Sequence, residues 1–355
     1  MYIPILVNLL QTVNGDTMPA KELRANAILT IGSIIASVAD NEDKEPFKAN
    51  VVEITQHLAS QIQSRLADDD PQDKAIKDCL AQCAGFLGQE FVQFMPLLLE
   101  QLLVDAQLDL DYKMESADLP STNDNMGAVV KIKGLGEQRI SMNTDAYQRK
   151  LGAFAVIFKV SENMGTAFAP YVEPILPIIT AHMPFEYNKA IRKFALKTFK
   201  NLLVAMGEPT NVQYLQQSLP MYIEQLNKNL YSKNQRVVKM LLKSFANNLK
   251  AVGRTNQQNR EFLNQEQINS LGPIMTGTLE LVTELKSAHQ QVLSMSKATY
   301  DLDDEDLARC QEEIDNICRA ATQVMEVSGQ LCEKFGDRAL SVCDTSAKAY
   351  FAAKL

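Results

Sequence analysis

The sequence predicts an all-α fold, an α-solenoid (superhelix) of HEAT-type antiparallel helix pairs. Leu, Ala, Gln, Lys and Glu dominate the 355 residues, whereas Gly (15) and Pro (13) are few and Trp is absent, which favours helices over strands. Hydrophobic residues make up 46% of the chain and charged residues 22%, so there is ample material for buried cores. A repeat array can extend this far as one body because each unit contacts only its neighbours.

Glycines mark the repeat. Five amphipathic runs end on an apolar residue followed by glycine, a signal for a helix C-terminus because glycine adopts the left-handed conformation readily. The dipeptides are Leu87-Gly88, Met164-Gly165, Met206-Gly207, Val252-Gly253 and Phe335-Gly336. These glycines lie 77, 42, 46 and 83 residues apart, and the two short intervals match the roughly 40–47 residues of a HEAT or armadillo unit.

We expect six helix pairs and the start of a seventh. The predicted pairs are 2–13 with 19–39, 46–66 with 71–88, 92–105 with 144–164, 167–183 with 187–206, 210–231 with 234–253, and 265–297 with 302–336, followed by a helix from about residue 340. Residues 1–355 are therefore expected to form one solenoid fragment, cut from a longer array because both ends fall inside helical patterns. One pair cannot bury its apolar face alone, so the concave side, lined by the second helices, is the expected binding surface.

An insertion interrupts the third pair at about residues 106–143. Helical periodicity fails there, and the run from Pro120 to Asp124 supplies helix breakers. Residues 129–133 and 138–142 alternate weakly between apolar and polar side chains, so a small hairpin is one interpretation of this segment.

Catalytic and metal-binding motifs are poorly represented. His57, His182 and His289 fall in different predicted repeats, and Cys79 and Cys83 share a helical face without further ligands. The six cysteines suit reduced thiols packed in an intracellular protein. We expect neither a signal peptide nor a membrane span, since no apolar run reaches about 18–20 residues. Without a phosphate-binding loop, nucleophile elbow or dinucleotide motif, the sequence predicts no enzyme, no catalytic residue, no cofactor and no metal.

Charge is distributed unevenly. Residues 187–254 contain 12 Lys and Arg against two Glu, which gives +10, whereas the rest of the chain carries −18. Basic residues recur at helical spacing on two predicted second helices, and we take them as candidate partner-binding residues: Lys189, Lys193, Lys197, Lys200, Arg236, Lys239, Lys243 and Lys250. If both helices face the concave side, they form a cationic wall suited to an acidic protein surface or to phosphates. A solvated helix face is the alternative.

Two acidic turns flank this basic region. Their residues are further candidates for partner binding: Asp68, Asp69 and Asp70, then Asp303, Asp304, Glu305 and Asp306. Acids at a helix start are favoured by capping and by the helix dipole, which is the structural interpretation. The functional interpretation is electrostatic steering of a basic partner.

Five segments carry a family resemblance: Ala67–Pro71, Gly85–Phe91, Phe94–Leu102, Lys131–Thr144 and Asp145–Ala153. They resemble the karyopherin-β (importin-β) nuclear transport receptors, closest to the branch that imports ribosomal proteins and histones. The resemblance is strongest over about residues 67–205 and implies a fragment from the C-terminal half of a longer receptor. Such a receptor binds cargo along the concave surface without catalysis, with Ran-GTP as a further candidate ligand.

The resemblance also implies the partners. They are cargo proteins with basic import signals, the Ran GTPase and Phe-Gly nucleoporins, with no membrane and no direct sequence-specific nucleic acid, and the implied location is shuttling between cytoplasm and nucleus at the nuclear envelope. The alternative is another HEAT scaffold, such as a phosphatase regulatory subunit or a microtubule-associated array. Irregular spacing and the insertion favour the receptor, because phosphatase scaffolds keep a nearly uniform period.

Overall fold

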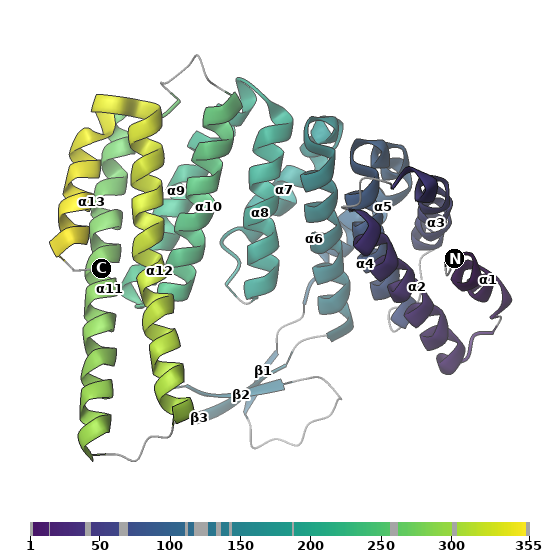
Figure 1. The fold of residues 1–355 in the computed structure, drawn as a ribbon, viewed down its shortest axis with the longest axis horizontal. Coiled ribbons are helices and arrows are strands. Elements are labelled where there is room, and N and C mark those ends of the chain that lie inside the picture. The colour runs from purple at the N-terminus through teal and green to yellow at the C-terminus, as the bar shows by residue number, and fades with distance from the viewer. Residues whose placement is uncertain are drawn as a thin grey trace. The chain divides into compact units, whose positions relative to one another are not determined.

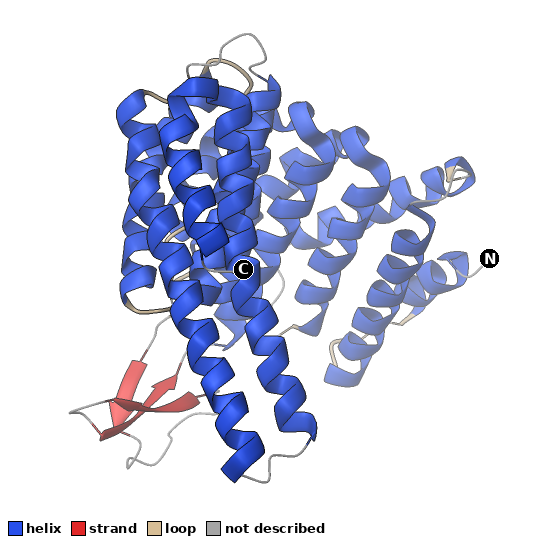
Figure 2. Cartoon of the chain, turned by 60° about the vertical axis from the view of Figure 1, so that its left-hand side comes forward, coloured by secondary structure: helices blue, strands red, loops and turns tan. Residues whose placement is uncertain are grey.

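The computed structural model describes residues 3–13, 15–39, 44–63, 70–110, 113–116, 127–132, 136–141, 144–186, 188–255, 262–299 and 304–352. Apart from one small sheet, the elements in these ranges are helices (Figure 2). The chain is an α-solenoid of consecutive helix pairs, which confirms the predicted fold class. It divides into two compact units, residues 1–201 (unit 1) and residues 202–355 (unit 2). A single continuous body over residues 1–355 stays a prediction.

Unit 1 contains four helix pairs, and their bounds match the predicted ones closely. The elements are α1 (Ile3–Thr12), α2 (Met18–Ala39), α3 (Glu45–Gln63), α4 (Pro71–Leu87), η1 (Gly88–Phe94), α5 (Met95–Gln107), α6 (Thr144–Met164), η2 (Gly165–Tyr171), α7 (Val172–His182) and α8 (Lys189–Met206, in this unit up to Asn201). The second helices α2, α4 and α6 pack one against the next, as do the first helices α3, α5 and α7 (Figure 1). This order is that of HEAT pairs stacked in sequence.

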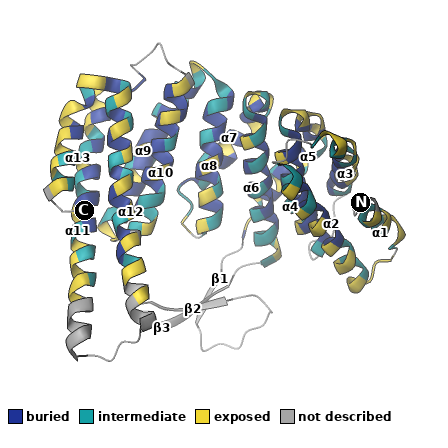
Figure 3. Ribbon diagram, viewed as in Figure 1, coloured by how far each residue is buried: buried dark blue, intermediate teal, exposed yellow. Residues whose placement is uncertain are grey.

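Unit 2 follows the same plan with longer helices. Its elements are α9 (Thr210–Tyr231), α10 (Gln235–Thr255), α11 (Gln265–Thr299), α12 (Asp304–Phe335), η3 (Gly336–Ala339) and α13 (Leu340–Ala352). The second helices α10 and α12 pack together, and the first helices α9, α11 and α13 form the other row (Figure 1). Buried residues concentrate on the sides where helices face one another, as Figure 3 shows.

Four of the five predicted cap glycines end their helices. Gly88, Gly165, Gly207 and Gly336 all have φ between +55° and +65°, the left-handed region in which a side chain is strained. The prediction is wrong at Gly253, which lies inside α10. A Cβ there would lie 2.5 Å from Cε of Lys334 on α12, so this glycine provides space for a neighbouring side chain.

The insertion forms a three-stranded antiparallel sheet. Its strands are β1 (Lys113–Ser116), β2 (Gly127–Ile132) and β3 (Gly136–Ser141), in the order β1-β3-β2, with Ala128 opposite Ile140 and Met114 opposite Ile140 on the other side. The predicted hairpin corresponds to β2 and β3. The sequence did not predict β1, a four-residue strand without β-branched residues.

α2 is, among the described residues, the one helix whose length and average apolarity would suit a membrane span, although it contains Lys21, Glu22 and Arg24 and its uncharged run is confined to Ala25–Ala39. In the structure Ile28, Ile31 and Ile35 of α2 are buried, and the helix packs against α4. Gly32 permits this contact, because a Cβ there would lie 3.2 Å from Cα of Cys79. Core helices pass the same test of length and apolarity, and this packing accounts for the buried isoleucines of α2.

Candidate partner-binding surface

The two basic helices begin at asparagine caps. Asn188 Oδ1 accepts hydrogen bonds from the backbone N–H groups of Ala190 (2.8 Å) and Ile191 (3.1 Å) at the start of α8. Asn234 Oδ1 accepts one from Val237 N–H (3.4 Å) at the start of α10. Asparagine is a preferred N-cap because its side chain satisfies N–H groups that the helix leaves free. These caps fix where each helix starts and therefore which residues face solvent.

On α8, in unit 1, the predicted basic residues lie on the solvent side. Lys189, Lys193 and Lys197 are exposed and Lys200 is half-buried, whereas the opposite side of α8 is buried in the unit. Each lysine therefore reaches solvent from one stripe, as the helical spacing predicted.

An aromatic ring adjoins this stripe. Lys197 Nζ lies 4.8 Å from the centroid of the Phe158 ring on α6, and Lys159 Nζ lies 5.7 Å from the same ring. Phe194 of α8 packs beside it at 5.7 Å between centroids. Lys159 Nζ also lies 3.3 Å from Glu162 Oε2, so this part of the stripe combines lysine side chains with an aromatic surface. Phe158 and Lys159 are not among the residues predicted from the sequence, although Lys159 directly follows Phe158 in the chain.

On α10, in unit 2, Arg236, Lys243 and Lys250 are exposed and Lys239 is half-buried. Arg254 is exposed on the same side of α10, four residues beyond Lys250. Arg254 is absent from the predicted stripe because the predicted helix ends at Gly253, whereas α10 continues to Thr255. The helical spacing of the basic residues was the signal that could have found it. That the stripes of α8 and α10 together form one wall stays a prediction.

The acidic candidates divide into described and undescribed residues. Asp70 is buried, and its carboxylate accepts a hydrogen bond from Gln72 N–H (3.0 Å) at the start of α4 and lies 3.2 Å from Lys21 Nζ. Burial alone would raise the pKa of Asp70, but these hydrogen bonds and the ion pair together hold it below its ordinary value. The structural interpretation therefore accounts for Asp70, and its buried carboxylate is not available to a partner.

The remaining acidic candidates have no described side-chain position. Asp68, Asp69 and Asp303 lie outside the described residues. Asp304, Glu305 and Asp306 form the first turn of α12, but their side chains are outside the described part of the structure. A role in binding a partner stays a prediction for all six.

A buried ion cluster joins three helices where the insertion begins. Lys77 Nζ on α4 lies 2.6 Å from Asp73 and 2.6 Å from Asp105 of α5, and Asp105 also accepts hydrogen bonds from Arg149 of α6 (2.7 Å) and Gln101 (2.9 Å). The side chains of Lys77 and Asp105 are 1% and 0% exposed. Charges this deep are tolerated only when paired. The cluster fixes the end of α5, from which the chain leaves for the sheet.

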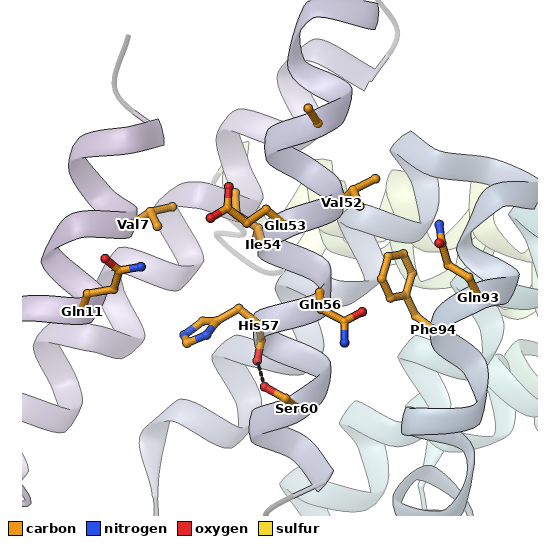
Figure 4. A pocket seen from close by; sticks show the side chains of 11 residues that line it. Val7, Gln11, Val52, Glu53, Ile54, Gln56, His57, Ser60, Gln93 and Phe94 are labelled. Atoms are coloured by element: carbon orange, nitrogen blue, oxygen red, sulfur yellow. Dashed lines mark hydrogen bonds between the residues drawn. The ribbon is translucent and has the colours of Figure 1, made fainter.

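A pocket of about 550 Å³ lies on the first-helix side of unit 1 (Figure 4). Val7 and Gln11 of α1 line one side, Phe94 of η1 lines the other, and His57 of α3 lies between them. Within the described ranges, no group of three or more His, Cys, Asp or Glu side chains is arranged to hold a metal ion.

The chain was compared with protein families, with known protein sequences and with solved structures. No protein-family model matches the chain. A segment covering 59% of the chain is 22% identical to 19% of importin subunit beta-3 of Saccharomyces cerevisiae. The structure of Kap121p bound to Pho4p matches with a TM-score of 0.67 at 14% identity, over 98% of this chain and 34% of that chain. Kap121p bound to Nup53p matches with a TM-score of 0.64 at 14% identity, over 98% and 34%.

The chain has the karyopherin fold. It spans about a third of the length of the solved karyopherin chains that it matches. In the karyopherin fold the stripes described above lie on the second helix of each pair, α8 and α10, whereas the pocket lies among first helices. The two kinds of helix thus offer different chemistry: the second helices carry a charged stripe, and the first helices line a pocket with both apolar and polar side chains.

Proposed function

We propose that this chain is part of a nuclear import receptor that binds partner proteins reversibly along the second helices of a karyopherin-type solenoid, without catalysis. The observation that carries the proposal is the match to Kap121p in complexes with Pho4p and Nup53p over 98% of this chain. By analogy, the partners are cargo proteins with basic import signals, the Ran GTPase in its GTP form and Phe-Gly nucleoporins. Such a receptor shuttles between cytoplasm and nucleus.

The positive charge of the stripes on α8 and α10 decides which partner surfaces can bind there. Lys193 and Lys197 on α8 repel a basic import signal, since like charges brought together at an interface are unfavourable. A basic signal therefore binds away from the stripes of α8 and α10, and these stripes contact acidic surfaces of the partner. Exposed charges of this kind raise the rate of encounter and set specificity more than they raise affinity.

A capture experiment tests the receptor proposal. The protein is immobilised and offered Ran loaded with GTP, Ran loaded with GDP, and a basic ribosomal protein. We expect capture of the cargo and of Ran-GTP, with little Ran-GDP, and release of cargo when Ran-GTP is added. If neither form of Ran is captured and the cargo is ignored as well, the proposal is wrong.

A charge-reversal variant tests the role of the α8 stripe. Lys193→Glu with Lys197→Glu is expected to weaken capture of at least one acidic partner, and the loss should shrink as salt rises because exposed charges are screened. The matched control is Lys44→Glu with Lys48→Glu, near the start of α3 on the first-helix side. Equal behaviour of the two variants toward every partner would make the stripe a solvated face.

A further inference from the structure

The solvent-facing residues of α10 form one narrow line, which we call the α10 seam. From Val238 onward, every described side chain of α10 that is not buried belongs to it, and Arg236 extends it toward the N-terminus. The seam residues are Arg236, Lys239, Met240, Lys243, Asn247, Lys250 and Arg254. Taken without Lys239, they are spaced alternately by four and three residues, which is the spacing of the contact positions in helix–helix seams.

Five of the seven seam residues are cationic, and α10 contains no acidic residue. Within the described part of the chain, Arg236, Lys243 and Arg254 form no ion pair. Lys250 differs, since Glu333 on α12 lies within reach of its charge. The hydrogen bond from Lys334 lowers the pKa of Glu333 most, and the charge of Lys250 lowers it further. Like charges aligned along a helix are mildly destabilising. The row therefore does not stabilise the fold, which points to a partner outside it.

The spacing of the cations selects the conformation of that partner. Arg236, Lys243 and Lys250 are seven residues apart, about 10.5 Å along the axis at 1.5 Å per residue. A second helix presents side chains on one face with the same period. An extended segment covers about 10 Å in three residues, but its first and fourth side chains point to opposite faces. One face of a strand therefore cannot follow this row in register.

We propose that the α10 seam docks an acidic helix of a partner protein, whose carboxylates recur at heptad spacing opposite Arg236, Lys243 and Lys250. Met240 and Asn247 lie between these cations and contact the apolar and polar side chains between the acids. This inference rests on the proposed function, since it names the partner class for one of the stripes that function uses. The attraction between the carboxylates and these cations is electrostatic, so binding of the partner helix should weaken as salt rises.

Two synthetic peptides probe the seam. The first has 21 residues of Ala, Gln and Glu, with six glutamates on one helical face, two in each of three heptads. The second, the permuted peptide, has the same composition with the glutamates spread over all faces. Binding to the protein is measured by fluorescence anisotropy at low and at high salt. We expect the one-face peptide to bind at least about fivefold more tightly than the permuted peptide at low salt, because only the former meets the row of cations in register.

Variants of the protein locate the site. The triple variant Arg236→Glu, Lys243→Glu and Lys250→Glu should weaken binding of the one-face peptide by about tenfold or more. Each exposed ion pair between peptide and protein contributes roughly a factor of two to five to the affinity. The matched control, Lys228→Glu with Lys233→Glu and Lys348→Glu, removes three basic residues elsewhere in unit 2 and should change binding by less than about twofold. The corresponding Gln variants of the seam should give an intermediate loss, and circular dichroism checks that all variants keep their helices.

Three results would overturn the inference. Equal binding of both peptides would show a general attraction of polyanions. Equal loss of peptide affinity in the seam and control variants would place the peptide elsewhere. Tighter binding of a duplex DNA probe than of the one-face peptide would make the occupant a nucleic acid. If the peptide fails while Ran-GTP and cargo are still captured, the inference is wrong and the proposed function stands. Failure of Ran-GTP and cargo capture by the unmodified protein counts against the proposed function instead.

Discussion

Replacing Asp105 by alanine tests whether the buried ion cluster holds the three helices of unit 1 together. Asp105 is fully buried and contacts Lys77 Nζ at 2.6 Å and Arg149 Nη2 at 2.7 Å. Its removal leaves Lys77 with Asp73 alone and leaves the buried Arg149 without this carboxylate. Breaking a buried ion pair by removing one partner costs about 3–5 kcal/mol, so we expect a loss of about 4 kcal/mol in the free energy of unfolding.

The control is Asp73→Ala, which removes the other partner of Lys77. Asp73 is 15% exposed, and Lys77 keeps Asp105, so the expected loss is about 1–2 kcal/mol. Urea titration followed by circular dichroism measures the global change, and amide hydrogen exchange in α4 and α6 measures the local one, which matters because repeat arrays unfold in parts. A loss below about 1 kcal/mol for Asp105→Ala, or equal losses for both variants, would refute the assigned role of the cluster.

Three further outcomes follow from packing and burial. Gly32→Ala should destabilise unit 1 by about 1–3 kcal/mol in urea titration, because the added Cβ meets the backbone of Cys79 at 3.2 Å; an unchanged midpoint would contradict this. Asp70→Ala should lower the free energy of unfolding by about 1 kcal/mol, and the amide protons of the first turn of α4 should lose their protection from hydrogen exchange first. Uniform loss of protection along α4 would count against a cap. Burial lowers the pKa of His182 below 6.5, so stability is full above about pH 6.5 and falls as pH drops through the folded pKa; His182→Phe should flatten this slope, and an unaltered slope would place its origin elsewhere.

The helices could be predicted because their physical signals are local. Amphipathic spacing and cap glycines such as Gly88 and Gly336 depend on a few neighbouring residues, and the predicted bounds of most helices differ from the observed ones by few residues. The exception at Gly253 is informative. A glycine that ends a helix and a glycine that admits Lys334 from another helix look the same in the sequence, and only the packing of α10 on α12 separates them.

The candidate surface could be predicted in part for the same reason. The stripe positions Lys193 and Lys243 follow from helical spacing, and both are exposed. The buried cluster could not be predicted, because Lys77, Asp105 and Arg149 are far apart in the chain and each reads as an ordinary charged residue until α4, α5 and α6 meet. For Asp70 the sequence favoured capping over partner contact, and the buried carboxylate accepts the hydrogen bond from Gln72 N–H that a cap requires.

Lysine reactivity in the presence of a captured partner tests the central claim, that partners bind along the second helices. The protein is acetylated with and without the cargo or Ran-GTP that it captures, and each lysine is quantified by mass spectrometry. We predict protection of Lys193 on α8 and Lys243 on α10, with unchanged reactivity at Lys48 on α3 and Lys348 on α13. Protection confined to Lys48 and Lys348, with Lys193 and Lys243 as reactive as in the free protein, would contradict the claim.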